Sequence, residues 1–341
     1  MSDLPELLRT LVESIGISGY EGHVREKIRE LIPREVESKV DSVGNLIASI
    51  GSGDPHIILI AHMDELGFLV SGIDEKGYVR LRRVGSFDDR YLPGKIFQIH
   101  TVNGPVEGVI GLTPPHLTVD QETAKKVFQS HELYLDVGKR SKNETMELGV
   151  RLLDPITLKK EFTIIGEDYF CCRSIDDRFG CLALIETLKK LNQMDLVRKL
   201  TFVWSVREET GLEGSRVIAN TIEADKAIVV DSYPSADAPM IPFHLAPAKL
   251  GDGPVLRIVD NGATASPELV ERARSIAQKH RIPLGAGATG GMTDGLPLQE
   301  KGIPMVPITS PIRYMHSPVE MCHRQDLERL IELLTYAALE I

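Results

Sequence analysis

Apolar and polar residues follow two different patterns along this chain, and the change of pattern divides it into three stretches. Before residue 65 and after residue 162, apolar stripes at helical spacing alternate with short, continuous apolar runs. Helices that alternate with buried strands predict an α/β domain. The predicted helices are Leu4–Ile15, His23–Ile32, Phe179–Leu188, Gly214–Thr221, Ser266–His280 and Arg324–Ala338, and the main predicted strands are Pro55–His62, Leu200–Val206, Ala227–Val230 and Ile303–Thr309.

The middle stretch has a different character. Short runs with apolar and polar alternation and tight turns predict strands at Phe68–Ile73, Tyr78–Val84, Lys95–Val102, Val106–Leu112 and Leu133–Val137. Helical periodicity returns there only at Thr118–His131. We therefore predict a mixed, largely parallel central sheet flanked by helices, formed by residues 1–69 and 164–341. A small β-barrel-like domain is inserted at residues 70–163.

Composition narrows the possible partners. The chain has 341 residues and a formal net charge of -10, which argues against nucleic acid and anionic membrane surfaces as partners. It contains no run of eighteen apolar residues, and its first residues do not resemble a signal or transit peptide. The four cysteines form neither a zinc-finger spacing nor a disulfide framework. These features predict a cytoplasmic protein.

Polar residues with metal-binding chemistry follow the predicted strands. Because the carboxyl ends of parallel strands meet at one sheet edge, these side chains are expected to converge there. Clustered carboxylates repel one another unless a cation lies between them. Nitrogen and oxygen ligands without thiolate suit zinc, cobalt or manganese, and their number is sufficient for two ions that share a carboxylate. The candidates are His62, Asp176, Glu208 or Glu209, Asp231 and His316.

Several of these residues have a simpler structural interpretation as well. His62 and Asp64 lie two apart on a strand and face one side, so Asp64 can hold the second ring nitrogen of a metal-bound His62 or merely form a polar pair with it. Asp176 is a candidate bridging ligand supported by Asp177 or Arg178, but two acids at a helix start also act as caps.

The adjacent acids Glu208 and Glu209 directly follow a core strand, where they repel each other. One can bind a metal while the other acts as general base, because zinc lowers the pKa of bound water to about 7. A solvated helix start is the alternative. Asp231 and His316 are weaker signals by themselves. The glycine-rich stretch Gly285–Asp294 lacks the ending of a phosphate-binding loop and is expected to form a tight substrate-lining loop.

Five stretches in this order resemble the tetrahedral (TET) and glutamyl aminopeptidases, some of which carry an endoglucanase label. They are AHMDELGF at 61–68, SIDDRFGC at 174–181, EETGLEGS at 208–215, GGMTD at 290–294 and RYMHSPVE at 313–320. The resemblance implies a zinc-exopeptidase-like fold and two ions, one on His62, Asp176 and Asp231 and the other on Asp176, Glu209 and His316. It makes Glu208 the general base and Asp64 the support of His62.

The resemblance also implies that the inserted domain mediates self-association, in assemblies from a dimer to a dodecamer. It points to short peptides as substrates. One departure concerns the stretch after Asp231, where the family usually carries a histidine and this chain has Ser232–Asp237. The wall of the substrate pocket is expected to differ there.

Three functions compete at this point. The first is a dinuclear aminopeptidase that removes N-terminal residues from short peptides. The second is another hydrolase, either a metal-dependent deacylase of N-acyl amino acids or an endoglucanase, although glycosidases generally use two carboxylates and no metal. The third is a scaffold whose metals only stabilise an oligomer. A spare carboxylate beside a ligand, as in Glu208-Glu209, favours catalysis over a closed structural site.

Overall fold

The computed structural model describes residues 3–118, 120, 122, 125–239 and 241–341. The chain forms two compact units. The first comprises Met1–Glu65, Phe162–Met315 and Val319–Ile341, and the second comprises Leu66–Glu161 with the short segment His316–Pro318.

A mixed sheet forms the centre of the first unit. Its strands lie in the order β1 (Ser38–Val40), β2 (Leu46–Ile50), β12 (Lys199–Ser205), β3 (His56–His62), β13 (Lys226–Val229), β17 (Met305–Ile312), β15 (Val255–Val259) and β16 (Gly285–Ala288), and β14 (Ser232–Pro234) also pairs with β17. The four middle strands, β12, β3, β13 and β17, run parallel. β2 and β15 flank this group, and each runs antiparallel to its neighbour in it, β12 and β17 respectively. The predicted largely parallel sheet is confirmed.

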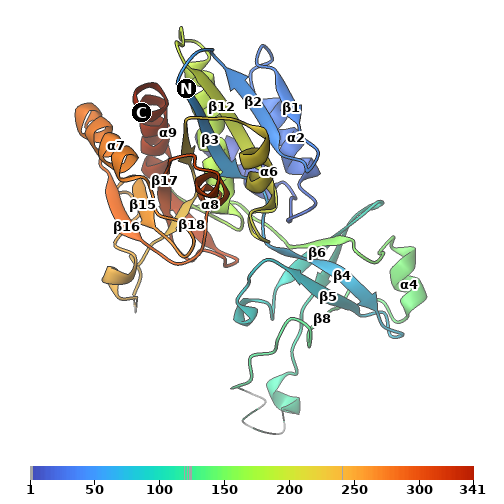
Figure 1. Cartoon of the computed structure of the whole chain (residues 1–341). Coiled ribbons are helices and arrows are strands. Elements are labelled where there is room, and N and C mark those ends of the chain that lie inside the picture. The colour runs from blue at the N-terminus through green and yellow to red at the C-terminus, as the bar shows by residue number, and fades with distance from the viewer. Residues whose placement is uncertain (1–2, 119, 121, 123–124, 240) are drawn as a thin grey trace. The chain divides into compact units, whose positions relative to one another are not determined.

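Helices cover both faces of this sheet (Figure 1) because its strands are apolar on both sides. Ile57 and Leu59 of β3 join a core with α1 (Leu4–Glu13), α2 (Gly22–Leu31), α5 (Ile175–Leu191), α7 (Pro267–His280) and α9 (Arg324–Glu340). The alternate residues Ile58 and Ile60 join a second core with α6 (Glu213–Thr221) and α8 (Gly295–Glu300). A continuous apolar run, such as residues 57–61, is what a strand buried on both faces requires.

A second, small sheet also belongs to the first unit. It is antiparallel and has the order β10 (Thr163–Ile165), β11 (Tyr169–Cys172) and β18 (Glu320–His323). β11 leads directly into α5, the longest helix together with α9 among the described residues. The position of α5 relative to the central sheet is set by its packing on β3 and on α9, which the first core shows.

The second unit is a nearly closed antiparallel barrel. Its strand order is β7 (Gly104–Val109), β6 (Ile96–Thr101), β9 (Pro155–Leu158), β4 (Gly67–Ile73), β5 (Val79–Val84) and β8 (Tyr134–Leu135). Val109 and Asp136 exchange two backbone hydrogen bonds of 2.9 Å, which brings the two ends of the sheet together. Phe68 and Phe97 fill the interior. The expected barrel-like β domain is confirmed, and it also carries the short helix α4 (Lys142–Glu147).

One expected loop has a different structure, and one expected helix lies partly outside the described residues. The expected loop Gly285–Asp294 begins instead with strand β16, because Gly285–Gly287 pair with Val255–Arg257 at the sheet edge. The expected helix Thr118–His131 includes residues 119, 121 and 123–124, which lie outside the described residues. Within the described part of the chain, every helix is too short or too polar to span a bilayer.

Candidate metal centre and active site

The parallel strands of the central sheet deliver most of the candidate residues to one edge. Ser205 at the end of β12 lies opposite His62 at the end of β3, so the turn with Glu208 and Glu209 starts beside His62. Val229, at the end of β13, pairs with Ile60, and Asp231 follows two residues later. The strand ends are therefore in register, as a shared site requires.

Asp176 reaches this edge by a different route, which corrects one expectation. It does not follow a strand of the central sheet but stands at the start of α5, just after β11 of the small antiparallel sheet. Its backbone and that of Asp177 are not yet helical. The sequence could not show this because β11 is a short apolar strand, like those of the central sheet.

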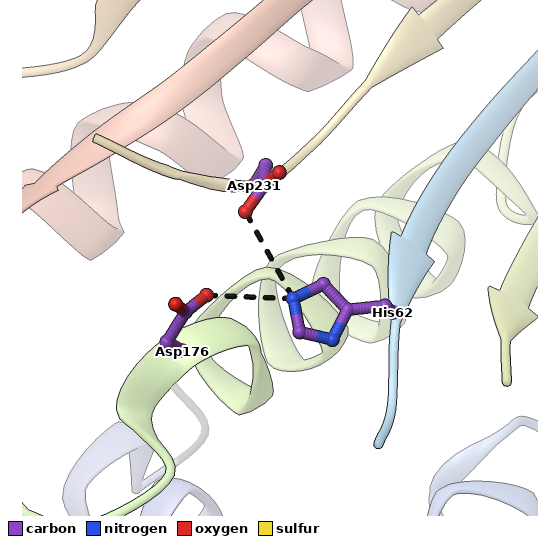
Figure 2. Close-up of side chains that lie close together, drawn as sticks. All are labelled: His62, Asp176 and Asp231. Carbon is purple, nitrogen blue, oxygen red and sulfur yellow. Dashed lines mark ion pairs between the residues drawn. The ribbon is translucent and has the colours of Figure 1, made fainter. Parts of the chain in front are cut away.

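Three buried side chains meet at the centre of this edge. Figure 2 shows His62, Asp176 and Asp231 pointing toward one another from β3, α5 and the end of β13. The His62 Nε2 atom lies 3.4 Å from Asp176 Oδ1 and 3.9 Å from Asp231 Oδ1, and their three potential ligand atoms are all within 4.8 Å of one another. Ligands about 2.0–2.2 Å from a tetrahedral zinc ion are separated by roughly 3.4 Å. The spacing therefore fits the ligand shell of a divalent cation.

Charge supports the same interpretation. Burial and the neighbouring Asp176 raise the pKa of Asp231 to about 7. Burial alone would lower the pKa of His62, but the carboxylates of Asp176 and Asp64 raise it well above its ordinary value. Nearby negative charge contributes to both pKa shifts, since it disfavours ionisation of a carboxyl group and favours a positive charge on the imidazole. A divalent cation supplies a positive charge at this position and binds the imidazole in its neutral form.

A second group of potential ligand atoms shares Asp176 with the first. Atoms of Asp176, Glu209 and His316 also lie within 4.8 Å of one another. Asp176 is buried, whereas Glu209 and His316 are half-buried. The predicted ligands therefore fall into two groups that have one carboxylate in common.

Asp64 has more partners than the sequence suggested. Its Oδ1 atom lies 3.5 Å from His62 Nδ1, the contact expected of a carboxylate that orients a histidine ligand. The same oxygen accepts the backbone N–H of Glu208 at 3.0 Å, and Oδ2 accepts the N–H of Glu209 at 3.2 Å and the hydroxyl of Ser18 at 2.6 Å. One buried carboxylate thus fixes both His62 and the turn with the two acids.

Glu208 lies within this cluster of acids. Burial, together with the nearby carboxylates of Asp231 and Glu209, raises the pKa of Glu208 well above its ordinary value, although His62 opposes the shift. Asp177 caps the following turn by accepting the Gly180 N–H at 3.0 Å. Neither Asp177 nor Glu208 belongs to the two groups of potential ligands.

Three further residues contact the site, although none of them was predicted from the sequence as a ligand or catalytic group. Arg257 of β15 is buried, lies 3.8 Å from Asp231 Oδ2 and donates to the Gly290 carbonyl. A charged residue in the apolar run Val255–Val259 was an available signal for it. Asp294 accepts a hydrogen bond from Ser205, and Asn45 accepts the Val206 N–H. Asp294 was expected only as the end of the substrate-lining loop Gly285–Asp294, and nothing in the sequence spacing points to Asn45.

The fold and the cluster define a class of α/β hydrolytic enzymes in which imidazole and carboxylate side chains can hold divalent metal at the carboxyl ends of parallel strands. The model of the M42 glutamyl aminopeptidase family matches residues 44–333, and the chain belongs to this family.

Relatives and solved structures agree with this assignment. Lysyl aminopeptidase of Pyrococcus furiosus is 31% identical over 338 residues, which cover 96% of this chain and 94% of the relative. The TET1 peptidase of Pyrococcus horikoshii is 40% identical with a TM-score of 0.92, covering 98% of this chain and 99% of that one. A Thermotoga maritima structure named endoglucanase is 28% identical with a TM-score of 0.79, covering 98% and 96%. The predicted metal-dependent aminopeptidase activity, a peptide hydrolysis, is thereby confirmed.

Proposed function

We propose that the enzyme holds two divalent ions per subunit, most simply zinc, with cobalt or manganese as alternatives. His62, Asp176 and Asp231 hold one ion, and Asp176, Glu209 and His316 hold the other. The observation that carries this proposal is the pair of ligand groups with Asp176 in common. Carboxylate and imidazole donors without thiolate suit these metals.

The metal ions, when bound, lower the pKa of a water molecule and polarise the scissile carbonyl of a peptide. Glu208 then acts as the general base: its carboxylate accepts the water proton and passes it to the leaving amine. Asp64 orients His62 and holds the backbone of Glu208 through its Oδ1 atom. Removal of N-terminal residues from short peptides is the resulting reaction.

The imidazole of His62 at the centre of the acids distinguishes this proposal from glycoside hydrolysis. A glycosidase needs two carboxyl groups on opposite sides of a glycosidic bond and has no use for a buried histidine between them. His62 has a raised pKa and two carboxylates near its Nε2 atom, which is a cation-binding arrangement. The name endoglucanase of one similar structure therefore does not alter the proposal.

We further propose that the inserted domain, predicted at 70–163 and compact here as Leu66–Glu161, mediates self-association. The TET1 peptidase of Pyrococcus horikoshii can assemble into a tetrahedron or a large octahedral shell. The second unit here exposes apolar side chains that such contacts would cover, among them Val102, Leu117 and Leu152. The assembly of this chain is proposed to lie between a dimer and a dodecamer. A cytoplasmic location is proposed from its four buried, unbridged cysteines.

The decisive experiment compares the wild-type enzyme with Glu208→Gln on a panel of aminoacyl-p-nitroanilides. The wild type is expected to lose activity with chelator, recover it with zinc or cobalt, and ignore N-acetylated substrates. Glu208→Gln is expected to bind metal normally and to lose at least about 100-fold in kcat, the scale of general-base catalysis. Substantial activity in Glu208→Gln would show that another group is the base, and activity that survives chelation would refute the metal centre.

A further inference from the structure

The turn that carries Glu208 and Glu209 is held in an unusual way. Four consecutive backbone N–H groups, those of residues 206–209, donate to side chains from the first 64 residues of the chain. Val206 donates to Asn45 at 3.0 Å, Arg207 to Glu21 at 3.2 Å, and the next two amides to the two oxygens of Asp64. Side chains from a distant segment therefore hold the turn in addition to its own backbone hydrogen bonds, such as that from the Gly214 N–H to the Val206 carbonyl at 3.0 Å.

Two of the residues behind this arrangement come from the segment between α1 and α2. Ile17 forms a parallel bridge with Glu65, and the Ser18 N–H donates to the Glu65 carbonyl at 3.2 Å. The Ser18 hydroxyl donates to Asp64 Oδ2 at 2.6 Å. Glu21 folds back so that one carboxylate oxygen accepts the N–H of Gly19 at 2.7 Å as well as that of Arg207. Ser18 and Glu21 are both buried.

These contacts constrain a backbone that would otherwise relax. Arg207 has a φ angle of 55°, a left-handed conformation that is strained for a non-glycine residue. A hydrogen bond from its N–H to Glu21 helps to hold it there. The fully buried Asp64 carboxylate accepts hydrogen bonds from the backbone N–H groups of Glu208 and Glu209. The Ser18 hydroxyl donates to the same carboxylate and restricts its rotation.

We propose that Ser18 and Glu21 are positioning residues for the reaction: Ser18 acts through Asp64 and Glu21 through Arg207, and together they fix the turn that presents Glu208 and Glu209. This inference rests on the proposed function, in which Glu208 is the general base. Neither residue touches substrate or metal in this role. Displacement of a general base by about 1 Å can lower the reaction rate roughly 100-fold. The Ser18 hydroxyl can therefore affect kcat although it lies outside the reacting groups.

The role makes a prediction that mere stabilisation of the fold does not. Loss of the Ser18 hydroxyl leaves the substrate-contacting side chains in place, so KM is expected to stay within about twofold while kcat falls by about 10-fold or more, the range for residues that support a ligand or base. Conservative replacements that keep the hydrogen bond, Ser18→Thr and Glu21→Gln, are expected to recover most of the turnover.

The experiment uses the full chain at saturating metal. Ser18→Ala, Ser18→Thr, Glu21→Ala and Glu21→Gln are compared with Ser275→Ala, a matched control whose hydroxyl donates only to the Glu271 carbonyl on the surface of α7. Four quantities are measured for each variant: kcat and KM on one aminoacyl-p-nitroanilide, the thermal midpoint, and the deuterium uptake of peptides covering residues 206–213.

The expected result is a lower kcat with unchanged KM in the two alanine variants, faster exchange at 206–213, and recovery in the two conservative variants. A kcat equal to that of Ser275→Ala, or unchanged exchange at 206–213, would overturn the inference. Loss of kcat without recovery in either conservative variant would overturn it also. Glu208→Gln distinguishes failure of the proposed function from failure of the positioning role. If Glu208→Gln is active, the proposed function fails. If Glu208→Gln is inactive while Ser18→Ala and Glu21→Ala are fully active, only the positioning role fails.

Discussion

Replacement of Arg178 by methionine tests how firmly the start of α5, and with it the proposed ligand Asp176, is held. The guanidinium is fully buried, donates to the Leu11 carbonyl at 2.6 Å and the Ser14 carbonyl at 3.1 Å, and lies 3.5 Å from Glu65 Oε1. It thereby joins the end of α1 to the first turn of α5. Methionine retains much of the apolar volume but supplies no donor and no charge.

These contacts set the expected loss in the free energy of unfolding. A hydrogen bond from a charged group contributes about 1.5–3 kcal/mol, and removal of one partner from a buried ion pair costs about 3–5 kcal/mol. The contributions overlap because all arise from one guanidinium, so Arg178→Met is expected to lower the free energy of unfolding by about 3–5 kcal/mol in total.

Urea denaturation at fixed protein and metal concentration measures this change, with Glu65→Gln and the double variant completing a cycle. Because the double variant removes both buried charges, it should be less destabilised than the two single variants added together, by about 1–3 kcal/mol. A loss below about 1 kcal/mol in Arg178→Met would refute the reasoning, since no buried charge would then depend on Arg178. Strict additivity of the two single variants would refute the coupling.

Two further predictions concern packing and pH. A Cβ atom at Gly180 would come closer than 3.0 Å to both carboxylate oxygens of buried Asp177, so Gly180→Ala is expected to destabilise the protein by about 1–3 kcal/mol. Gly111 has open space around it, so the control Gly111→Ala should change stability by less than about 0.5 kcal/mol. Equal melting temperatures of the two variants would contradict this prediction. Burial raises the pKa of Asp326 from 3.8 to about 7 even though it accepts the N–H groups of Gly251 and Gly253. The folded state therefore binds a proton between these values that the unfolded state has released, so this residue's contribution to the free energy of unfolding is greatest below pH 4 and falls by up to about 4 kcal/mol as the pH rises to 7. Asp326→Asn should flatten the stability profile in that interval, and parallel wild-type and variant profiles from urea titrations would exclude the effect.

The sequence predicted those parts of the site that depend on strand order and alternation. Apolar runs ending at His62, before Glu208 and before Asp231 belong to adjacent parallel strands, so the expectation that their ends converge needed only the general behaviour of such sheets. The inserted barrel was predictable for a similar reason, because short alternating strands with tight turns recur throughout that stretch.

What the sequence did not predict depends on tertiary contacts between side chains and backbone. Ser18, Glu21 and Asn45 are polar residues in turns, where such residues are common. Their hydrogen-bond partners lie 46, 186 and 161 positions away along the chain, respectively. No periodicity records such a contact. The same limit explains the misplacement of Asp176: a short apolar strand before a helix is compatible with either sheet, and only packing selects one.

The proposed ligands come from different elements, and this has a structural consequence for the proposed metal centre. His62 ends strand β3 of the central sheet and Asp231 follows its strand β13, whereas Asp176 belongs to a helix that starts from the small antiparallel sheet. Without a cation, folding must bury these acids next to one another, and burial together with the neighbouring Asp176 raises the pKa of Asp231 to about 7. A divalent ion removes that repulsion and is bound only when both elements are in place, so its binding free energy adds to the stability of the folded state. In the proposed dinuclear enzyme, metal binding and the stability of this fold are therefore thermodynamically linked.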